Sequence, residues 1–271
     1  MSLTDPHIPD RHAIGVFDSG VGGLTVLHEC LVSLPHEDFV YLGDTGNFPY
    51  GPKPLAEVRR LAFSAAAFMV ELEVKLIVIA CNSAAAATLP QLQASFATPI
   101  VGVVMPGARA AVQETRSRRV GILATEATVR SNAYQKALHA LDAGLEIFPV
   151  ACPRLAPLIQ AGDVFSEQTE QAAREYVAPL KEAAGDTVIL GCTHYPLITP
   201  MLRRLLGPRV ALINSAEETA REVAEILERK AIRNLEQGEG DCRFFATGNT
   251  EEFREVGARF LQLPIREVTQ L

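Results

Sequence analysis

The hydrophobic positions of this chain fall into short runs rich in β-branched residues, separated by longer amphipathic stretches. Short apolar runs indicate strands buried on both faces, and the longer stretches indicate helices between them. This alternation predicts an α/β fold with parallel sheets and helices on both faces. We predict strands over Ala13–Phe17, Phe39–Leu42, Leu76–Ala80, Ile100–Val104, Arg119–Ala124, Leu145–Val150, Thr187–Leu190, Val210–Ile213 and, last, Arg243–Ala246, and a long helix over Ala216–Leu235.

The two halves of the chain resemble each other. Ile14–Phe17 opens the first half and Val120–Leu123 opens the second, with the same glycine at the second position. A cysteine follows at nearly the same distance in each half, Cys81 in the first and Cys192 in the second. We therefore predict two pseudo-symmetric, flavodoxin-like domains with the active site in the cleft between them.

The domain boundaries follow from the places where the chain changes halves. We expect the first crossing at Met105–Gly107 and the second at Asn214–Ala216. The first domain then comprises residues 1–104 and 214–271, and the second comprises residues 105–213.

Both cysteines end a predicted strand and are followed by polar side chains. Cys81 precedes Asn82 and Ser83, and Cys192 precedes Thr193 and His194. Open α/β sheets bind ligands at this edge, where a helix N-terminus stabilises a thiolate. A lone buried cysteine is usually a packing residue, but the paired polar settings favour one site with a thiol on either side.

The remaining cysteines and the histidines do not predict a metal site. Cys30, Cys152 and Cys242 lack the polar setting, and we interpret them as packing residues. The chain has no Cys-x-x-Cys spacing and its six histidines are scattered, so we expect no metal and no disulfide framework.

Composition limits the partners of the protein. The formal net charge of −7 argues against nucleic acid, because phosphate binding requires a basic face. No apolar run has the length of a membrane span, and the polar start of the sequence does not resemble a signal peptide. We therefore expect no membrane partner and a cytoplasmic location.

A thiol on each side of a small molecule suits inversion of a carbon centre. One thiolate removes a weakly acidic proton from one face, and the opposite thiol supplies a proton to the other face. A free thiol has a pKa of about 8.5, so a modest downward shift gives a thiolate near neutrality. We expect helix N-termini and a protonated His194 to supply that shift. A disulfide oxidoreductase or a Cys–His hydrolase fits the two separated thiols less well.

Three further segments favour a small anionic, amino-acid-like ligand. Asp18 precedes a glycine-rich turn, where it either contacts an ammonium or a catalytic proton, or caps a helix. Asp44–Gly51 is a turn-rich loop after the second strand. Thr125–Thr128 occupies the matching position in the second half and reads, taken alone, as a helix cap.

Together these segments resemble the glutamate racemases of the aspartate/glutamate racemase superfamily. The resemblance rests on Val16–Gly23, on Asp44-Thr45 with Pro49-Tyr50-Gly51, on Ala80–Ser83, on Ser131–Tyr134 and on Gly191–Leu197. It implies interconversion of L- and D-glutamate without a cofactor, supplying D-glutamate for bacterial peptidoglycan.

The resemblance also implies roles for individual residues. Cys81 and Cys192 become the catalytic acid/base thiols, assisted by Asp18 and His194 respectively. The substrate-binding residues that it implies are Asp18, Ser19, Tyr50, Gly51, Asn82, Ser83, Thr125, Thr128, Thr193 and His194.

The sequence departs from the family pattern at a few positions. Ser83 replaces a threonine and keeps the hydroxyl, Gly46 replaces a small residue such as alanine, and Asn214 replaces an aspartate. Gln160 stands where many members carry a glutamate, so any role that needs a negative charge there is lost.

Two alternatives to glutamate racemisation remain open. One is racemisation of a related acid, aspartate or a hydantoin, because the same two-thiol logic applies. The other is a non-catalytic regulatory protein. The partner is thus a small molecule, and a homodimer is one possibility.

Overall fold

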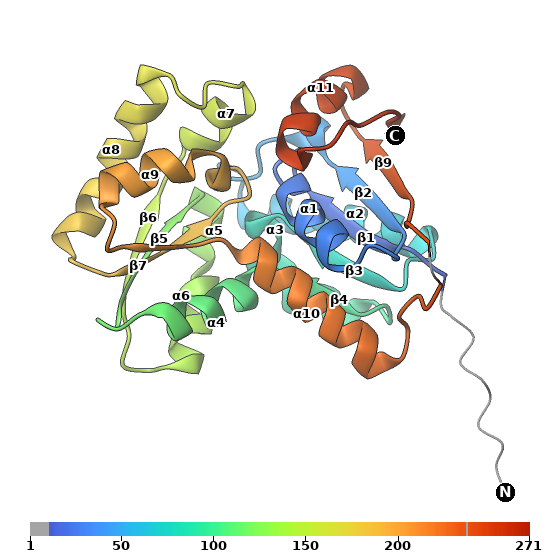
Figure 1. Ribbon diagram of the computed structural model, residues 1–271, viewed down its shortest axis with the longest axis horizontal. Helices are drawn as coiled ribbons and strands as arrows, with labels where there is room; N and C mark the ends of the chain where they lie inside the picture. Colours follow the sequence, from blue (N-terminus) through green and yellow to red (C-terminus); the bar gives the residue numbers. More distant parts are fainter. Residues whose placement is uncertain (1–10, 237) are drawn as a thin grey trace, which may run out of the picture.

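The strands form two separate sheets, each entirely parallel, in a computed structural model that describes residues 11–236 and 238–271. The first sheet has the order β10-β9-β2-β1-β3-β4, and the second has the order β6-β5-β7-β8. The strands are β1 Ile14–Asp18, β2 Phe39–Gly43, β3 Leu76–Ile79, β4 Ile100–Gly102, β5 Arg119–Ala124, β6 Glu146–Ala151, β7 Thr187–Gly191, β8 Ala211–Ile213, β9 Cys242–Ala246 and β10 Thr269–Gln270. Figure 1 shows the two sheets side by side, each with its own helices.

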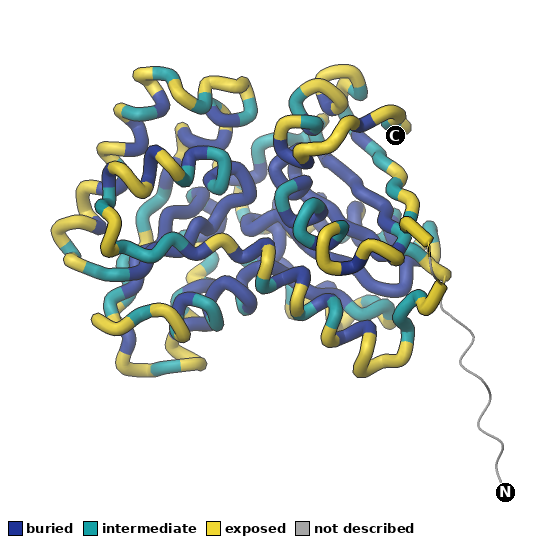
Figure 2. The backbone as a smooth tube through the Cα atoms, viewed as in Figure 1, coloured by how far each residue is buried: buried dark blue, intermediate teal, exposed yellow. Residues whose placement is uncertain are grey.

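Helices connect the strands and cover the sheets. They are α1 Leu24–Ser33, α2 Leu55–Glu71, α3 Asn82–Ser95, α4 Val104–Glu114, α5 Glu126–Ser131, α6 Ala133–Leu141, α7 Leu155–Gln160, α8 Glu167–Glu182, α9 Thr199–Leu206, α10 Ser215–Lys230 and α11 Thr250–Leu261, with 3₁₀ turns η1 Thr45–Asn47 and η2 Tyr195–Ile198. The central strands of both sheets are buried and the outer helix faces are exposed, as Figure 2 shows. No helix among the described residues is both long and apolar enough to cross a membrane.

The two sheets share one strand order. The order β2-β1-β3-β4 in the first sheet corresponds, strand by strand, to β6-β5-β7-β8 in the second. Cys81 follows β3 and Cys192 follows β7, so the cysteines occupy equivalent positions in the two halves. The predicted α/β fold with two parallel sheets is confirmed. The first sheet takes strands from both ends of the chain, whereas the second is built only from the middle.

The predicted strands are all present, with bounds within two residues of those expected. Two details of the prediction are wrong. A further strand, β10, follows β9 and pairs through Thr269 with Phe245; its two polar, exposed residues carry no hydrophobic pattern. Val104 begins α4 rather than ending β4, so the first crossing between halves at Met105–Gly107 is helical.

Local features determine both ends of helix α10, a side-chain cap at its start and a left-handed residue at its end. The Asn214 side chain accepts a hydrogen bond from the Ala216 N–H, which caps the helix. Acidic residues in the first turn and basic residues in the last turn complement the helix dipole. The helix stops at Lys230, earlier than the predicted Leu235, because Ala231 adopts a left-handed conformation with φ 55°.

Candidate active site

A small cavity of about 120 Å³ lies between the carboxyl ends of the two sheets. Both cysteines line it, Cys81 from the first half and Cys192 from the second, and both are buried. The polar residues that line it include Ser19, Tyr50, Asn82, Ser83, Thr125, Glu126, Thr193 and His194. Ligand pockets for drug-sized molecules span about 300–1,000 Å³, so this cavity suits a much smaller molecule.

On one side, Cys81 is connected to a buried carboxylate through a hydroxyl. The Cys81 thiol contacts Ser19 Oγ at 3.5 Å, and the Ser19 hydroxyl lies 3.4 Å from Asp18 Oδ1. Asp18 ends β1 and is fully buried; its Oδ1 also accepts a hydrogen bond from the Gly20 N–H at 2.9 Å. The short turn after β1 thus fixes both Asp18 and Ser19 beside Cys81.

On the other side, Cys192 has an imidazole as its neighbour. His194 Nδ1 lies 3.8 Å from Cys192 Sγ, and His194 Nε2 lies 3.0 Å from Gln160 Oε1. An amide oxygen only accepts hydrogen bonds, so Nε2 carries the proton and Nδ1 is free to accept one from the thiol. Gln160, at the end of α7, therefore orients the imidazole so that the basic nitrogen of His194 faces Cys192.

His194 is enclosed by apolar groups that come from distant parts of the chain. Its ring lies 5.5 Å from that of Phe48 and 5.2 Å from that of Phe260. A side chain on Gly22 would clash with the imidazole, with a Cβ 2.5 Å from His194 Nδ1, so glycine permits this close approach. Burial lowers the pKa of His194 to about 3, and the imidazole is neutral near pH 7.

The pKa values of the two thiols move upward, against the expectation from sequence. Burial, followed by the nearby charge of Asp18, raises the pKa of Cys81 to about 12. Burial likewise raises the pKa of Cys192 well above its ordinary value. Backbone N–H groups lower both pKa values but do not offset desolvation, and the neutral His194 supplies no positive charge. Burial also raises the pKa of Asp18 to about 6.

Hydrogen bonds between the two halves close the walls of the cavity. Ser83 Oγ and Thr125 Oγ1 lie 2.7 Å apart, joining the first turn of α3 to the residue that caps α5. The Tyr134 hydroxyl donates to Asn82 Oδ1 at 2.7 Å. These contacts hold side chains from both halves in one wall.

The loop after β2 is fixed on both sides of the cavity. The Tyr50 hydroxyl donates to Asp44 Oδ2 at 2.6 Å within the first half. The Gly51 carbonyl accepts from the Ala127 N–H at 2.9 Å, which ties the loop to the second half. Tyr50 and Gly51 are thereby held at the edge of the cavity.

The structure brings most of the predicted site residues to this cavity. Cys81, Cys192, His194, Ser19, Tyr50, Gly51, Asn82, Ser83, Thr125 and Thr193 all line it. Asp18 and Thr128 do not line it: Asp18 lies behind Ser19, and Thr128 lies behind Thr125, with the two threonine hydroxyls 3.0 Å apart.

Sequence reasoning missed several residues of the wall. They are Phe48, Pro49, Pro52, Glu126, Cys152, Pro153, Ala156 and Pro157. Cys152, predicted only to pack, follows β6 at the same sheet edge as Cys192. The sequence held a signal for Cys152, because it comes soon after the predicted strand Leu145–Val150, and residues that follow a parallel strand lie at the ligand-binding edge of the sheet.

The cavity offers no evident metal centre. Within residues 11–236 and 238–271, no three side chains of histidine, cysteine, aspartate or glutamate gather in a way that could hold a metal ion. The arrangement instead supports proton transfer, with a thiol on each side and a basic group near each thiol.

Comparison with known proteins extends over nearly the whole chain. A profile of the Asp/Glu/Hydantoin racemase family matches residues 26–223. The glutamate racemase of Geobacter metallireducens is 45% identical over 259 residues, which cover 96% of this chain and 96% of that protein.

Solved structures show the same relationship. The glutamate racemase RacE1 of Bacillus anthracis superposes with a TM-score of 0.93 at 41% identity, covering 97% of this chain and 98% of that one. The enzyme from Francisella tularensis, in complex with D-glutamate, superposes with a TM-score of 0.91 at 33% identity, with the same coverage. The chain therefore belongs to the Asp/Glu/hydantoin racemase family.

Proposed function

We propose that this protein is a glutamate racemase that inverts the α-carbon by a two-thiol acid/base mechanism without a cofactor. The observation that carries this function is the presence of Cys81 and Cys192 in one cavity, on equivalent strand ends of opposing sheets. The glutamate racemases that resemble the chain over nearly their full length support glutamate as the substrate.

The two thiols exchange roles with the direction of the reaction. In one direction the thiolate of Cys81 takes the α-proton, and the thiol of Cys192 gives its proton to the opposite face of the planar carbanion. In the other direction Cys192 removes the proton and Cys81 supplies it. Each turnover leaves the proton count of the enzyme unchanged but moves one proton from one thiol to the other.

Each thiol has its own base. Asp18 accepts the proton of Cys81 through the Ser19 hydroxyl, which lies between them at 3.5 Å and 3.4 Å. His194 accepts the proton of Cys192 at Nδ1, directly across 3.8 Å. The two halves of the mechanism are therefore asymmetric, with an acid residue on one side and a neutral imidazole on the other.

Because burial raises the pKa values of both thiols, we infer that the bound substrate helps to ionise them. The α-ammonium of glutamate introduces a positive charge into a buried cavity that two thiols line, with Asp18 behind Ser19. An opposite charge at close range favours the ionised form of each thiol, so binding lowers the pKa values that burial raises. The thiolate therefore forms when glutamate binds, and without substrate the cysteines stay protonated and less reactive.

The cavity wall supplies donors for the two carboxylates of glutamate. Asn82 and Ser83 open helix α3, where backbone N–H groups and the helix dipole favour an anion. Ser19, Tyr50, Gly51, Thr125 and Thr193 complete the proposed binding set, with Thr128 supporting Thr125 from behind. Asp18 acts through its neighbours rather than from the cavity wall.

Several further expectations stay predictions. They are the domain division into residues 1–104 with 214–271 and 105–213, a cytoplasmic location, and a homodimer. D-Glutamate for peptidoglycan synthesis is the product that we propose for this enzyme.

The function is tested by incubating the reduced protein with L-glutamate in deuterated water, with no added cofactor. We expect deuterium to enter the α-carbon and optical activity to fall to zero. Exchange with aspartate or a hydantoin but not with glutamate would establish the related-acid alternative. Tight binding of glutamate with no exchange would establish the regulatory alternative.

A further inference from the structure

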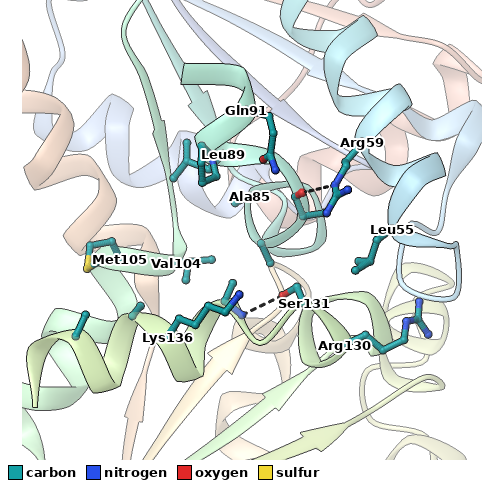
Figure 3. A pocket seen from close by; sticks show the side chains of 16 residues that line it. Leu55, Arg59, Ala85, Leu89, Gln91, Val104, Met105, Arg130, Ser131 and Lys136 are labelled. Atoms are coloured by element: carbon teal, nitrogen blue, oxygen red, sulfur yellow. Dashed lines mark hydrogen bonds between the residues drawn. The ribbon is translucent and has the colours of Figure 1, made fainter. Parts of the chain in front are cut away.

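Helices α5 and α6 meet at a short junction within the Ser131–Tyr134 motif, which the thiol chemistry does not use. Asn132 adopts a left-handed conformation with φ 56° and separates the two helices. The Ser131 hydroxyl donates to the Thr128 carbonyl at 2.6 Å, and its oxygen accepts from the Ala133 N–H at 3.1 Å. Figure 3 shows Ser131 at this junction. The first turn of α6 is therefore fixed relative to α5.

Tyr134 lies in that first turn and is buried. Its hydroxyl donates to Asn82 Oδ1 at 2.7 Å, and Asn82 directly follows Cys81. Its ring lies against Gly191, which directly precedes Cys192; a Cβ at that glycine would be 3.3 Å from Tyr134 Cε2. One side chain of the second half thus contacts the chain neighbours of both cavity thiols.

The Tyr134 hydroxyl is a donor because a second residue occupies its oxygen. The Ser215 side chain hydrogen-bonds to that oxygen, and Gly107 packs beside it. Burial raises the pKa of Tyr134 more than the hydrogen bond from Ser215 lowers it, so the hydroxyl keeps its proton near neutral pH. The proton is therefore available to the side-chain carbonyl oxygen of Asn82.

This hydrogen bond determines which end of the Asn82 amide is left for a ligand. A side-chain amide has a carbonyl oxygen, which accepts, and an NH₂ group, which donates. Tyr134 engages Asn82 Oδ1, whereas Asn82 Nδ2 makes no hydrogen bond to another residue in the described part of the chain. Because Asn82 lines the substrate cavity, its amide offers a donor to a molecule bound there.

We propose that Tyr134 is a positioning residue for substrate binding, which holds Asn82 so that Nδ2 donates to a carboxylate of glutamate. The inference rests on the proposed function, because it takes glutamate as the ligand. A carboxylate only accepts hydrogen bonds, so an amide turned through about 180° would present its oxygen and repel the substrate. Tyr134 is the one hydrogen-bond partner of the Asn82 side chain among the described residues, so its hydroxyl selects between these two orientations.

Glutamate binding tests this role without relying on turnover. The Kd is measured by isothermal titration with racemic glutamate, whose composition the enzyme cannot change. Tyr134→Phe keeps the buried ring and removes only the hydroxyl. We expect the Kd and the KM to rise roughly tenfold, because binding of a charged group loses an oriented donor. We expect kcat to change less than about threefold, because no proton-transfer group is altered.

A matched control removes a hydroxyl elsewhere in the second half. Tyr176 lies on α8, outside the substrate cavity, and its hydroxyl contacts Arg154. Tyr176→Phe should therefore leave the Kd for glutamate unchanged. Binding is compared at a temperature where urea unfolding shows each variant to be folded. An equal loss of affinity in Tyr134→Phe and Tyr176→Phe would overturn the positioning role.

A double-mutant cycle shows whether Tyr134 acts through Asn82. In Asn82→Ala the amide is absent, so the addition of Tyr134→Phe should change the Kd less than about twofold. A tenfold loss from Tyr134→Phe in both backgrounds, roughly the size expected for one such bond, would mean that Tyr134 acts through packing and would overturn the proposal.

A second change at Asn82 tests the donor itself. Asn82→Asp keeps an oxygen for the Tyr134 hydroxyl but removes the NH₂ group, so it should weaken binding at least as much as Tyr134→Phe does. Binding of wild-type strength by Asn82→Asp would contradict the role of Nδ2.

The outcomes separate the positioning role from the proposed function. Equal Kd values for Tyr134→Phe and the wild type, in a protein that racemises glutamate, would overturn the positioning role alone. A wild type that binds glutamate without racemising it, and whose Kd rises in Tyr134→Phe, would overturn the proposed function alone. A wild type that binds no glutamate would overturn both.

Discussion

Asp18 and Thr193 are joined by a hydrogen bond that spans the two halves of the molecule. The Thr193 hydroxyl donates to Asp18 Oδ2 at 3.1 Å. Asp18 ends β1 in the first sheet, and Thr193 follows Cys192 at the end of β7 in the second. The carboxylate assigned to one thiol is therefore positioned by the residue next to the other thiol, so the two halves of the proton chemistry are physically linked.

Removing this hydrogen bond should shift the pH dependence of racemisation. The hydrogen bond from Thr193 is one of the contacts that lower the pKa of Asp18, which burial raises to about 6. In Thr193→Val the pKa of Asp18 rises further, so more of the carboxyl is protonated and cannot act as a base. We expect the acidic limb of the kcat/KM profile to move to higher pH. Thr193→Ser keeps the hydroxyl and should retain the original limb.

Replacement of either thiol should abolish racemisation. A positioned acid or base contributes about 10²–10⁴-fold to rate, so Cys81→Ser and Cys192→Ser should each lose at least about a hundredfold in kcat. Deuterium exchange into each enantiomer distinguishes which thiol removes which proton. Cys242→Ser, a change at a cysteine outside the cavity, is the matched control. Normal racemisation by both single variants of the cavity would contradict the two-thiol mechanism.

The sequence predicted the ends of the strands and the meeting of the two cysteines because both depend on local pattern. Buried β-branched runs identify β3 and β7, and parallel strands place the residues after them at one edge. The same pattern could not reveal β10, whose two residues are polar, nor the exact end of α10, which depends on the backbone of Ala231.

The pKa values of the site residues could be predicted only in part, because they depend on burial, which is a property of the whole fold. The expectation of lowered thiol pKa values used the local features of Cys81 and Cys192, namely a helix N-terminus and a histidine. Phe48 and Phe260 come from segments far from His194 in sequence, and their rings help to keep that imidazole neutral. The direction of the shift therefore depended on contacts that sequence pattern does not show.

The buried Asp18 should also make folding stability depend on pH. Its pKa is about 6 in the folded protein and 3.8 as the ordinary value, so the folded state binds the proton more tightly. The free energy of unfolding contributed by this group is largest below about pH 3.8 and falls as pH rises through 6. Asp18→Asn cannot titrate. We expect urea unfolding between pH 4 and 7.5 to show the wild type losing stability relative to Asp18→Asn, and a constant difference would contradict the raised pKa.

Gln160 fixes the side of His194 that carries the proton. In the folded protein Nε2 donates to Gln160 Oε1, and Nδ1 faces Cys192. Nitrogen-15 NMR should therefore show His194 with a protonated Nε2 and a bare Nδ1 near pH 7, because the pKa of about 3 keeps the ring neutral. A protonated Nδ1 would show that the glutamine donates instead and that His194 cannot take the proton of Cys192.

Gln160→Glu adds a negative charge beside His194 while keeping the shape of the side chain. A carboxylate beside Nε2 stabilises the imidazolium and raises the pKa of His194 from about 3. Protonated His194 cannot accept a proton from Cys192, so proton removal by that thiol should weaken as pH falls, over a range where the wild type is unaffected. Removal of the opposite enantiomer's proton by Cys81 depends on Asp18 and should keep its acidic limit near pH 6. An equal shift in both directions would mean that Gln160 acts on the whole cavity rather than through His194.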